Sequence, residues 1–179
     1  FLMGEEPYFI DFLSDHFTSS VISEEEKSFN QVVLYGKDVS VNDIMSQARQ
    51  YPFMGDKMLV VIKEAQELVK TIDQFSSYFK SVQPSTILVF CYKYKTLDKR
   101  KELYKTLSKS EFAEIFESNK LKDYQVEGWI KTLISDEKLE IEPKAVAMLV
   151  EFLGNDLSKI SNEIDKLKII LKNDKLITA

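Results

Sequence analysis

Two short runs of apolar residues constrain the fold of this chain more than any other feature. They are Met58–Ile62 (MLVVI) and Thr86–Phe90 (TILVF), and neither alternates apolar with polar residues. Each strand must therefore be buried on both faces. Two further strands are predicted at 1–3 and 31–35, with helical periodicity between the runs. Strands of this kind that alternate with helices predict an α/β domain, in which helices cover both faces of a parallel sheet.

The other elements of this domain follow from periodicity and from turn signals. Pro7 suits the first position of a helix that places Phe9, Leu13 and Phe17 on one face. Further helices are predicted at 42–50, 72–79 and 98–108, with a short fifth strand at 113–116. The alternation stops near residue 117, so we expect one domain over residues 1–120 and a second over 121–179.

From residue 123 onward the sequence predicts helices only, packed as a small three-helix bundle. Pro143 suits the start of the second helix, Gly154 its end, and Asp156 the cap of the third. The residues expected to face inward are Val126, Ile130 and Leu133, with Trp129 beside them, then Val146, Leu149, Val150 and Leu153, and finally Leu157, Ile160, Ile164, Leu167 and Leu171.

Bulk composition excludes several classes of protein. A net charge of −5 argues against a protein that coats nucleic acid unaided, although a local basic patch is compatible with it. The single cysteine, Cys91, excludes an internal disulfide and fits a reducing cytosol. No apolar run is long enough for a membrane span. The abrupt first and last residues lead us to expect a fragment of a longer protein.

The first predicted strand runs into a turn where a phosphate-binding loop would lie. Such a loop needs several glycines, a lysine and a hydroxyl residue. This chain has one glycine, two carboxylates and a proline there, in the order Gly4, Glu5, Glu6, Pro7. Proline removes an amide donor and the carboxylates repel phosphate. We therefore predict a degenerate nucleotide loop.

Other residues that could carry chemistry lack partners in the sequence. Glu64 follows the strand 58–62 next to a lysine, which favours a solvated strand end over a magnesium ligand. His16 is the only histidine, so it supports neither a zinc site nor a catalytic triad. We expect His16 at the surface, and Cys91 and Trp129 in the interior. No catalytic residue, metal site or cofactor is predicted.

A basic run lies between residues 93 and 109, with tyrosines interleaved. A solvated surface is the ordinary explanation, and contact with a phosphate backbone or a partner is the alternative. The central candidates for such contact are Lys99, Arg100 and Lys101. The full run comprises Lys93, Lys95, Lys99, Arg100, Lys101, Lys105 and Lys109, with Tyr92, Tyr94 and Tyr104.

A break between a predicted helix and strand places an aromatic residue at a tip. Pro52 disfavours helix at Tyr51, and Gly55 allows a turn, so Phe53 sits between the two elements. Spacing alone leaves two alternatives. Phe53 either folds back into its own core or is an exposed anchor for another protein.

Four segments together resemble a known family. Their order and spacing are similar to those of the delta subunit of the bacterial DNA polymerase III clamp loader, over essentially the whole chain. The resemblance implies an AAA+-type five-stranded parallel sheet followed by a three-helix lid, with the family's C-terminal collar domain absent from this sequence. The segments are GEEPYFID (Gly4–Asp11), YPFMGDKMLVVI (Tyr51–Ile62), LDKRKELYK (Leu97–Lys105) and GNDLSKISNEIDKL (Gly154–Leu167).

The resemblance also implies a function. Family members bind and open the ring-shaped sliding clamp with a hydrophobic wedge, which falls here on Pro52, Phe53 and Met54. They do so without hydrolysing ATP, in agreement with the degenerate loop and with Leu157 at the position of a catalytic lid arginine. The implied partners are the clamp (beta subunit), the motor subunits and delta-prime, and primed DNA through the assembled complex. The implied location is the bacterial cytoplasm, at the nucleoid-associated replisome, with no membrane partner.

Two alternatives from other classes remain. The chain could be an accessory protein that binds nucleic acid through its basic run, or a divergent nucleotide hydrolase with an unrecognised site. The missing phosphate-loop lysine counts against the hydrolase.

Overall fold

The computed structural model describes residues 1–53, 55–171 and 174–179. Met54, one of the three predicted wedge residues, therefore lies outside the described residues. The chain divides into two compact units, residues 1–119 and 120–179. None of the helices in the described part of the chain is long and apolar enough to cross a membrane.

The first unit is built on a parallel sheet, as predicted. Over the described residues the sheet has five strands in the order β2-β3-β4-β1-β5. Leu59 of β3 pairs with Ile87 of β4, and Leu2 of β1 pairs with Cys91 further along β4. The fifth strand was predicted three residues too early, at 113–116, since β5 begins only at Phe116. The strands are β1 (Leu2–Gly4), β2 (Gln31–Tyr35), β3 (Met58–Lys63), β4 (Thr86–Lys93) and β5 (Phe116–Ser118).

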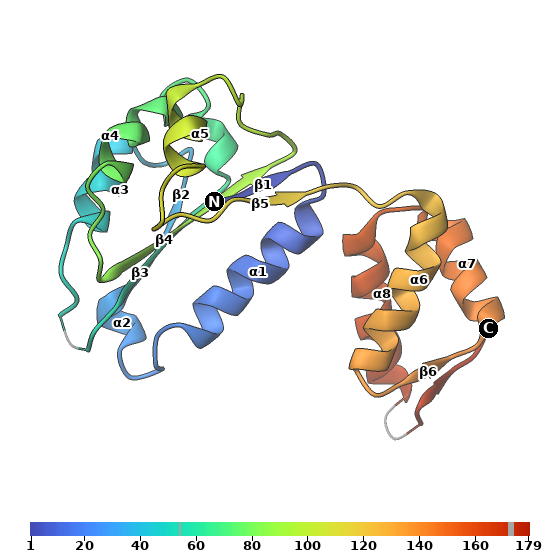
Figure 1. Cartoon of the computed structure of the whole chain (residues 1–179). Helices are drawn as coiled ribbons and strands as arrows, with labels where there is room; N and C mark the ends of the chain where they lie inside the picture. The colour runs from blue at the N-terminus through green and yellow to red at the C-terminus, as the bar shows by residue number, and fades with distance from the viewer. Residues whose placement is uncertain (54, 172–173) are drawn as a thin grey trace. The chain divides into compact units, whose positions relative to one another are not determined.

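Helices cover both faces of the sheet, which explains the apolar strands (Figure 1). Leu59 and Val61 of β3 belong to the core beneath α1, together with Ile10. Val60 and Ile62 face the opposite core, which contains residues of α3, α5 and the 3₁₀ turn η2. The elements are α1 (Pro7–Ser20), α2 (Lys27–Asn30), α3 (Val41–Ala48), η1 (Ala65–Leu68), η2 (Ile72–Phe75), α4 (Ser76–Phe79) and α5 (Glu102–Leu107).

Several predicted helix boundaries and faces need correction. Residues 72–79 form a 3₁₀ turn followed by a short α-helix rather than one helix. Helix α5 starts four residues later than predicted, since residues 98–100 form a turn in which the Asp98 carboxylate accepts the Arg100 N–H (2.9 Å). In α1 the fully buried residues are Ile10 and Ser14, while the predicted Phe9, Leu13 and Phe17 are half-buried. Cys91 is buried and His16 is exposed, as predicted.

The second unit contains the predicted helices, α6 (Asp123–Asp136), α7 (Pro143–Leu153) and α8 (Leu157–Leu171). It is not helical only, because β6 (Glu140–Ile141) and β7 (Leu176–Ile177) form a short parallel pair. Asp156 caps α8 as predicted, accepting the N–H of Lys159 (3.1 Å). In α6 the buried residue of the third turn is Ile134 rather than Leu133, and Trp129 is half-buried rather than interior.

Candidate functional site

In the turn between β1 and α1, the backbone N–H groups of two residues donate hydrogen bonds to carbonyl groups of other segments of the first unit. The N–H of Gly4 donates to the carbonyl of Lys95 (3.0 Å), and the N–H of Glu6 donates to the carbonyl of Ser118 (3.1 Å). Gly4 has φ +144°, and a Cβ atom there would lie 2.0 Å from the carbonyl oxygen of Ser118. The turn therefore requires glycine in order to pack against β5, and the N–H groups of both residues already have acceptors.

The start of α1 is likewise occupied by the chain's own groups. The carboxylate of Glu6 is buried and accepts the N–H of Tyr8 (3.0 Å). Pro7, at the first helical position, has no N–H to offer. A phosphate at this helix end would have to displace the Glu6 carboxylate, which already interacts favourably with the positive end of the helix dipole.

A lysine occupies the carboxyl edge of the sheet, where parallel sheets bind nucleotides and metals. Lys93, the last residue of β4, places its Nζ 2.8 Å from Asp11 of α1 and 2.8 Å from Glu64, which follows β3. Lys93 is nearly buried, so its assignment to an exposed basic run was wrong. The physical reason is that β4 continues past Phe90, and strand alternation turns Lys93 inward between the two carboxylates.

The two charge types in this cluster stabilise each other. Burial would lower the pKa of Lys93, but the bonds to Asp11 and Glu64 outweigh burial and raise that pKa above its ordinary value. Partial burial would raise the pKa of Glu64, but hydrogen bonds from Lys93 and Gln66 bring it below its ordinary value. Glu64 is thus paired with an internal cation rather than free in solvent. Over the described residues no group of three or more His, Cys, Asp or Glu side chains could hold a metal ion.

The three central basic candidates are exposed, and each has an acidic neighbour. Lys99 lies 3.5 Å from Glu117, and Lys101 pairs with Asp73. The Arg100 guanidinium holds both carboxylate oxygens of Asp98, with the shortest contact 2.8 Å, and its hydrogen bonds keep the pKa of Asp98 well below the usual range. These ion pairs neutralise part of the positive charge that would otherwise attract a phosphate backbone.

The loop between α3 and β3 carries Pro52 and Phe53 of the predicted wedge. Phe53 is 76% exposed, and Pro52 before it is half-buried. The alternative in which Phe53 fills its own core is therefore wrong. Burying the exposed ring of Phe53 against an apolar surface of a partner would be favourable.

Two hydrogen bonds hold this loop to the rest of the first unit. The N–H of Phe53 donates to Oδ1 of Asn30 (2.9 Å), a fully buried residue at the end of α2. The hydroxyl of Tyr78 donates to the carbonyl of Ala48 (3.2 Å), the last residue of α3. A capping box between Ser40 and Asp43 starts α3 at a defined residue. The backbone that carries the exposed ring of Phe53 is thus fixed in place by hydrogen bonds.

Comparison with known proteins assigns the chain to a family. Residues 1–119 match the family described as DNA polymerase III, delta subunit. The chain belongs to this family. The DNA polymerase III subunit delta of Bacillus subtilis (strain 168) is 27% identical over 186 residues, which cover 99% of this chain and 53% of that protein. The chain thus spans about half the length of this curated relative, 53%.

Solved structures agree with the family assignment. The Bacillus subtilis DNA clamp loader delta protein aligns with 99% of this chain and 55% of its own, at 26% identity and a TM-score of 0.74. The RuvB Holliday junction branch migration motor of Thermotoga maritima aligns with 97% of this chain and 56% of its own, at 19% identity and a TM-score of 0.56. The likeness to RuvB concerns the fold alone, and it supports the AAA+-type sheet that the resemblance implied.

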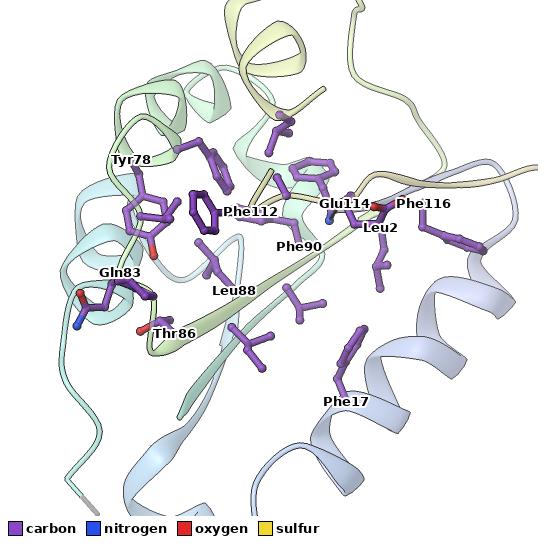
Figure 2. A pocket seen from close by; sticks show the side chains of 18 of the residues that line it. Leu2, Phe17, Tyr78, Gln83, Thr86, Leu88, Phe90, Phe112, Glu114 and Phe116 are labelled. Atoms are coloured by element: carbon purple, nitrogen blue, oxygen red, sulfur yellow. Dashed lines mark hydrogen bonds between the residues drawn. The ribbon is translucent and has the colours of Figure 1, made fainter. Parts of the chain in front are cut away.

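This delta-family chain also has an apolar cavity of about 520 Å³ beside the amino-terminal half of β4 (Figure 2). Phe17 of α1, Leu88 and Phe90 of β4, and Phe112 line it, with polar groups from residues such as Thr86. Ligands of parallel sheets bind at the carboxyl ends of the strands. The cavity lies away from that edge, beside the amino-terminal half of β4.

Two residues near Phe53 were missed by reasoning from this delta-family sequence. Asn30 holds the backbone of Phe53, and the ring of the neighbouring Phe29 lies 5.5 Å from the ring of Phe53, centroid to centroid. Only the order of the strands in the sheet could have predicted that these residues lie beside Phe53. The segments that precede two adjacent parallel strands, β2 and β3, meet at the same edge of the sheet.

Proposed function

We propose that this chain is the clamp-binding part of a clamp-loader delta subunit, which binds and opens the ring-shaped sliding clamp without hydrolysing ATP. The observation that carries the proposal is the outward position of Phe53 on a backbone held by Asn30. Burying one Phe ring in an apolar pocket contributes roughly 2–3 kcal/mol. Neighbours such as Pro52 and Met54 must therefore add to the affinity.

Opening of the clamp needs no chemistry in this mechanism. A subunit that binds the distorted clamp more tightly than the closed clamp shifts the equilibrium toward the open ring. The first unit acts as an AAA+-like domain with a degenerate nucleotide loop at Gly4, Glu5, Glu6 and Pro7, and the second unit acts as its lid. Motor subunits, delta-prime and primed DNA are the partners of the assembled complex.

The absence of hydrolysis is supported by the occupied groups at the carboxyl edge of the sheet. The N–H groups of Gly4 and Glu6 already have acceptors, and Lys93 fills the space between Asp11 and Glu64. A titration with a fluorescent ATP analogue and magnesium should give no saturable binding to this chain. Saturable binding would instead support the alternative of a divergent nucleotide hydrolase.

The clamp-binding proposal is tested with two matched variants, Phe53→Ala and Phe112→Ala. Phe112 is 77% exposed, and it lies in the same unit on a different loop. In surface binding with a purified sliding clamp, Phe53→Ala should weaken the complex about 30-fold or more, while Phe112→Ala should leave it within twofold of wild type. Equal affinities for wild type and Phe53→Ala, with both folded by circular dichroism, would refute the proposal.

A further inference from the structure

The loop that carries Phe53 rests on a short segment distant in sequence, residues 26–30, which we call the platform segment. Three independent relationships join the two. They are the bond from the Phe53 N–H to Asn30, the ring contact between Phe29 and Phe53, and the close approach of Gly55 to Glu26. A Cβ atom on Gly55, whose φ is +72°, would lie 2.3 Å from Oε1 of Glu26.

Sheet topology accounts for this proximity. β2 and β3 are adjacent parallel strands, with Gln31 paired to Leu59. The platform segment leads into β2, and the Phe53 loop leads into β3, so both lie at the amino edge of the sheet. Figure 1 shows α2 next to the loop that enters β3. The juxtaposition is therefore fixed by the central sheet rather than by the loop alone.

The ring of Phe29 is itself exposed. It is 57% accessible, and it meets Phe53 at a centroid distance of 5.5 Å with the ring planes tilted by 32°. An exposed ring that only supported Phe53 could be buried beneath it, at a gain in free energy. Instead the two rings form one continuous aromatic surface, which is the composition of binding hot spots.

We propose that Phe29 is a second contact residue for the sliding clamp, and that Phe29 and Phe53 enter the apolar surface of the clamp as a two-ring anchor. This inference rests on the proposed function, because it takes the clamp as the partner. It adds a residue that lies outside the predicted wedge, and it makes the platform segment part of the interface. Asn30, which accepts the backbone N–H of Phe53, acts as a positioning residue.

The test compares three alanine variants for affinity to a purified sliding clamp. The matched control is Phe12 on α1, an exposed ring (61%) that also contacts another aromatic ring, that of the half-buried Tyr8, at 6.4 Å. Phe29→Ala should weaken binding about tenfold, Phe53→Ala about 30-fold or more, and Phe12→Ala less than twofold.

The possible results separate the inference from the proposed function. If Phe53→Ala weakens binding and Phe29→Ala binds like wild type, the two-ring anchor is refuted while the proposed function stands. If neither substitution weakens binding, the proposed function itself fails.

A second measurement separates direct contact from an indirect effect on Phe53. A photo-crosslinking phenylalanine analogue at position 29, 53 or 12 of the otherwise unchanged chain is irradiated with the clamp. Crosslinks to the clamp from positions 29 and 53, and none from position 12, are expected. A crosslink from position 53 without one from position 29 would show that Phe29 only supports its neighbour, and would overturn the inference.

Discussion

The backbone N–H of Phe53 donates a hydrogen bond to Oδ1 of Asn30 across 2.9 Å, although the two residues are 23 positions apart in the sequence. Asn30 is fully buried, whereas the side chain of Phe53 is 76% exposed. One bond thus connects a rigid interior position to the residue that we propose meets the clamp. Its loss should affect both the stability of the loop and its binding.

Asn30→Ala should release the Phe53 loop. Removing the acceptor costs about 1–2 kcal/mol in the free energy of unfolding, because a buried polar interaction is lost. Hydrogen exchange followed by NMR should show faster exchange of the Phe53 amide, by about tenfold or more. The Asp43 amide, held by Oγ of Ser40 in α3, provides the control and should exchange at an unchanged rate. Unaltered protection of Phe53 would show that the bond does not hold the loop.

Gly4→Ala should destabilise the first unit severely. The new Cβ would lie 2.0 Å from the Ser118 carbonyl oxygen, and φ of +144° is unfavourable for alanine. We expect a loss of more than about 3 kcal/mol in urea unfolding. Gly128→Ala in α6 is the opposite case, since nothing lies within 4 Å of its Cβ position. That variant should gain about 0.5–1 kcal/mol. Comparable stability of the two variants would contradict the packing described for Gly4.

Lys93→Met should lower stability most at neutral pH. The raised pKa of Lys93 means that its contribution is present below about pH 10 and is lost as the pH rises through the raised value. The lowered pKa of Glu64 means that its contribution is present above about pH 4.3 and is lost as the pH falls. The substitution should therefore cost about 1–3 kcal/mol at pH 7, reduced from a fully buried pair because both carboxylates are partly exposed.

Urea unfolding at two pH values checks this expectation. The difference between wild type and Lys93→Met should be smaller at about pH 3 than at about pH 7, because the stabilisation from the ionised Glu64 is lost as the pH falls through its lowered pKa. Lys99→Met is the control, because Lys99 is exposed and lies 3.5 Å from its partner Glu117. It should leave the free energy of unfolding nearly unchanged at both pH values. A difference for Lys93→Met that is the same at both pH values would show that the ion pairs are not its cause.

Arg100→Glu tests the alternative of a nucleic-acid-binding protein. Arg100 is held by Asp98, and the chain carries a net charge of −5, so the isolated chain should bind primed DNA weakly with or without the substitution. We expect a change of less than about twofold in a filter-binding titration at physiological salt. Binding that falls steeply with salt and is lost in Arg100→Glu would support the basic run as a DNA contact.

The sheet was predictable because its cause is local. Burial on both faces leaves a strand no position for polar residues, so β3 and most of β4 can be recognised in a short window. The pair β6 and β7 could not be recognised in this way. Each has two residues, which is shorter than any period that a sequence window can resolve.

The site was only partly predictable because its contacts are distant in sequence. The proline and glycine around Phe53 predicted its position at a tip between helix and strand, but only the family resemblance favoured an exposed ring over a buried one. Lys93 was misplaced, since its partners Asp11 and Glu64 come from other elements. Phe29 gave no local signal, and only the pairing of β2 with β3 brings it beside Phe53.

The ammonium of Lys93 has a consequence for timing. With this internal cation and the Gly4 and Glu6 amides all engaged, we expect the carboxyl edge of the sheet to leave ATP unbound. In the proposed role, this chain therefore does not itself control when it binds the clamp. We expect another subunit of the complex to set the time of binding, by covering Phe29 and Phe53 and then exposing them.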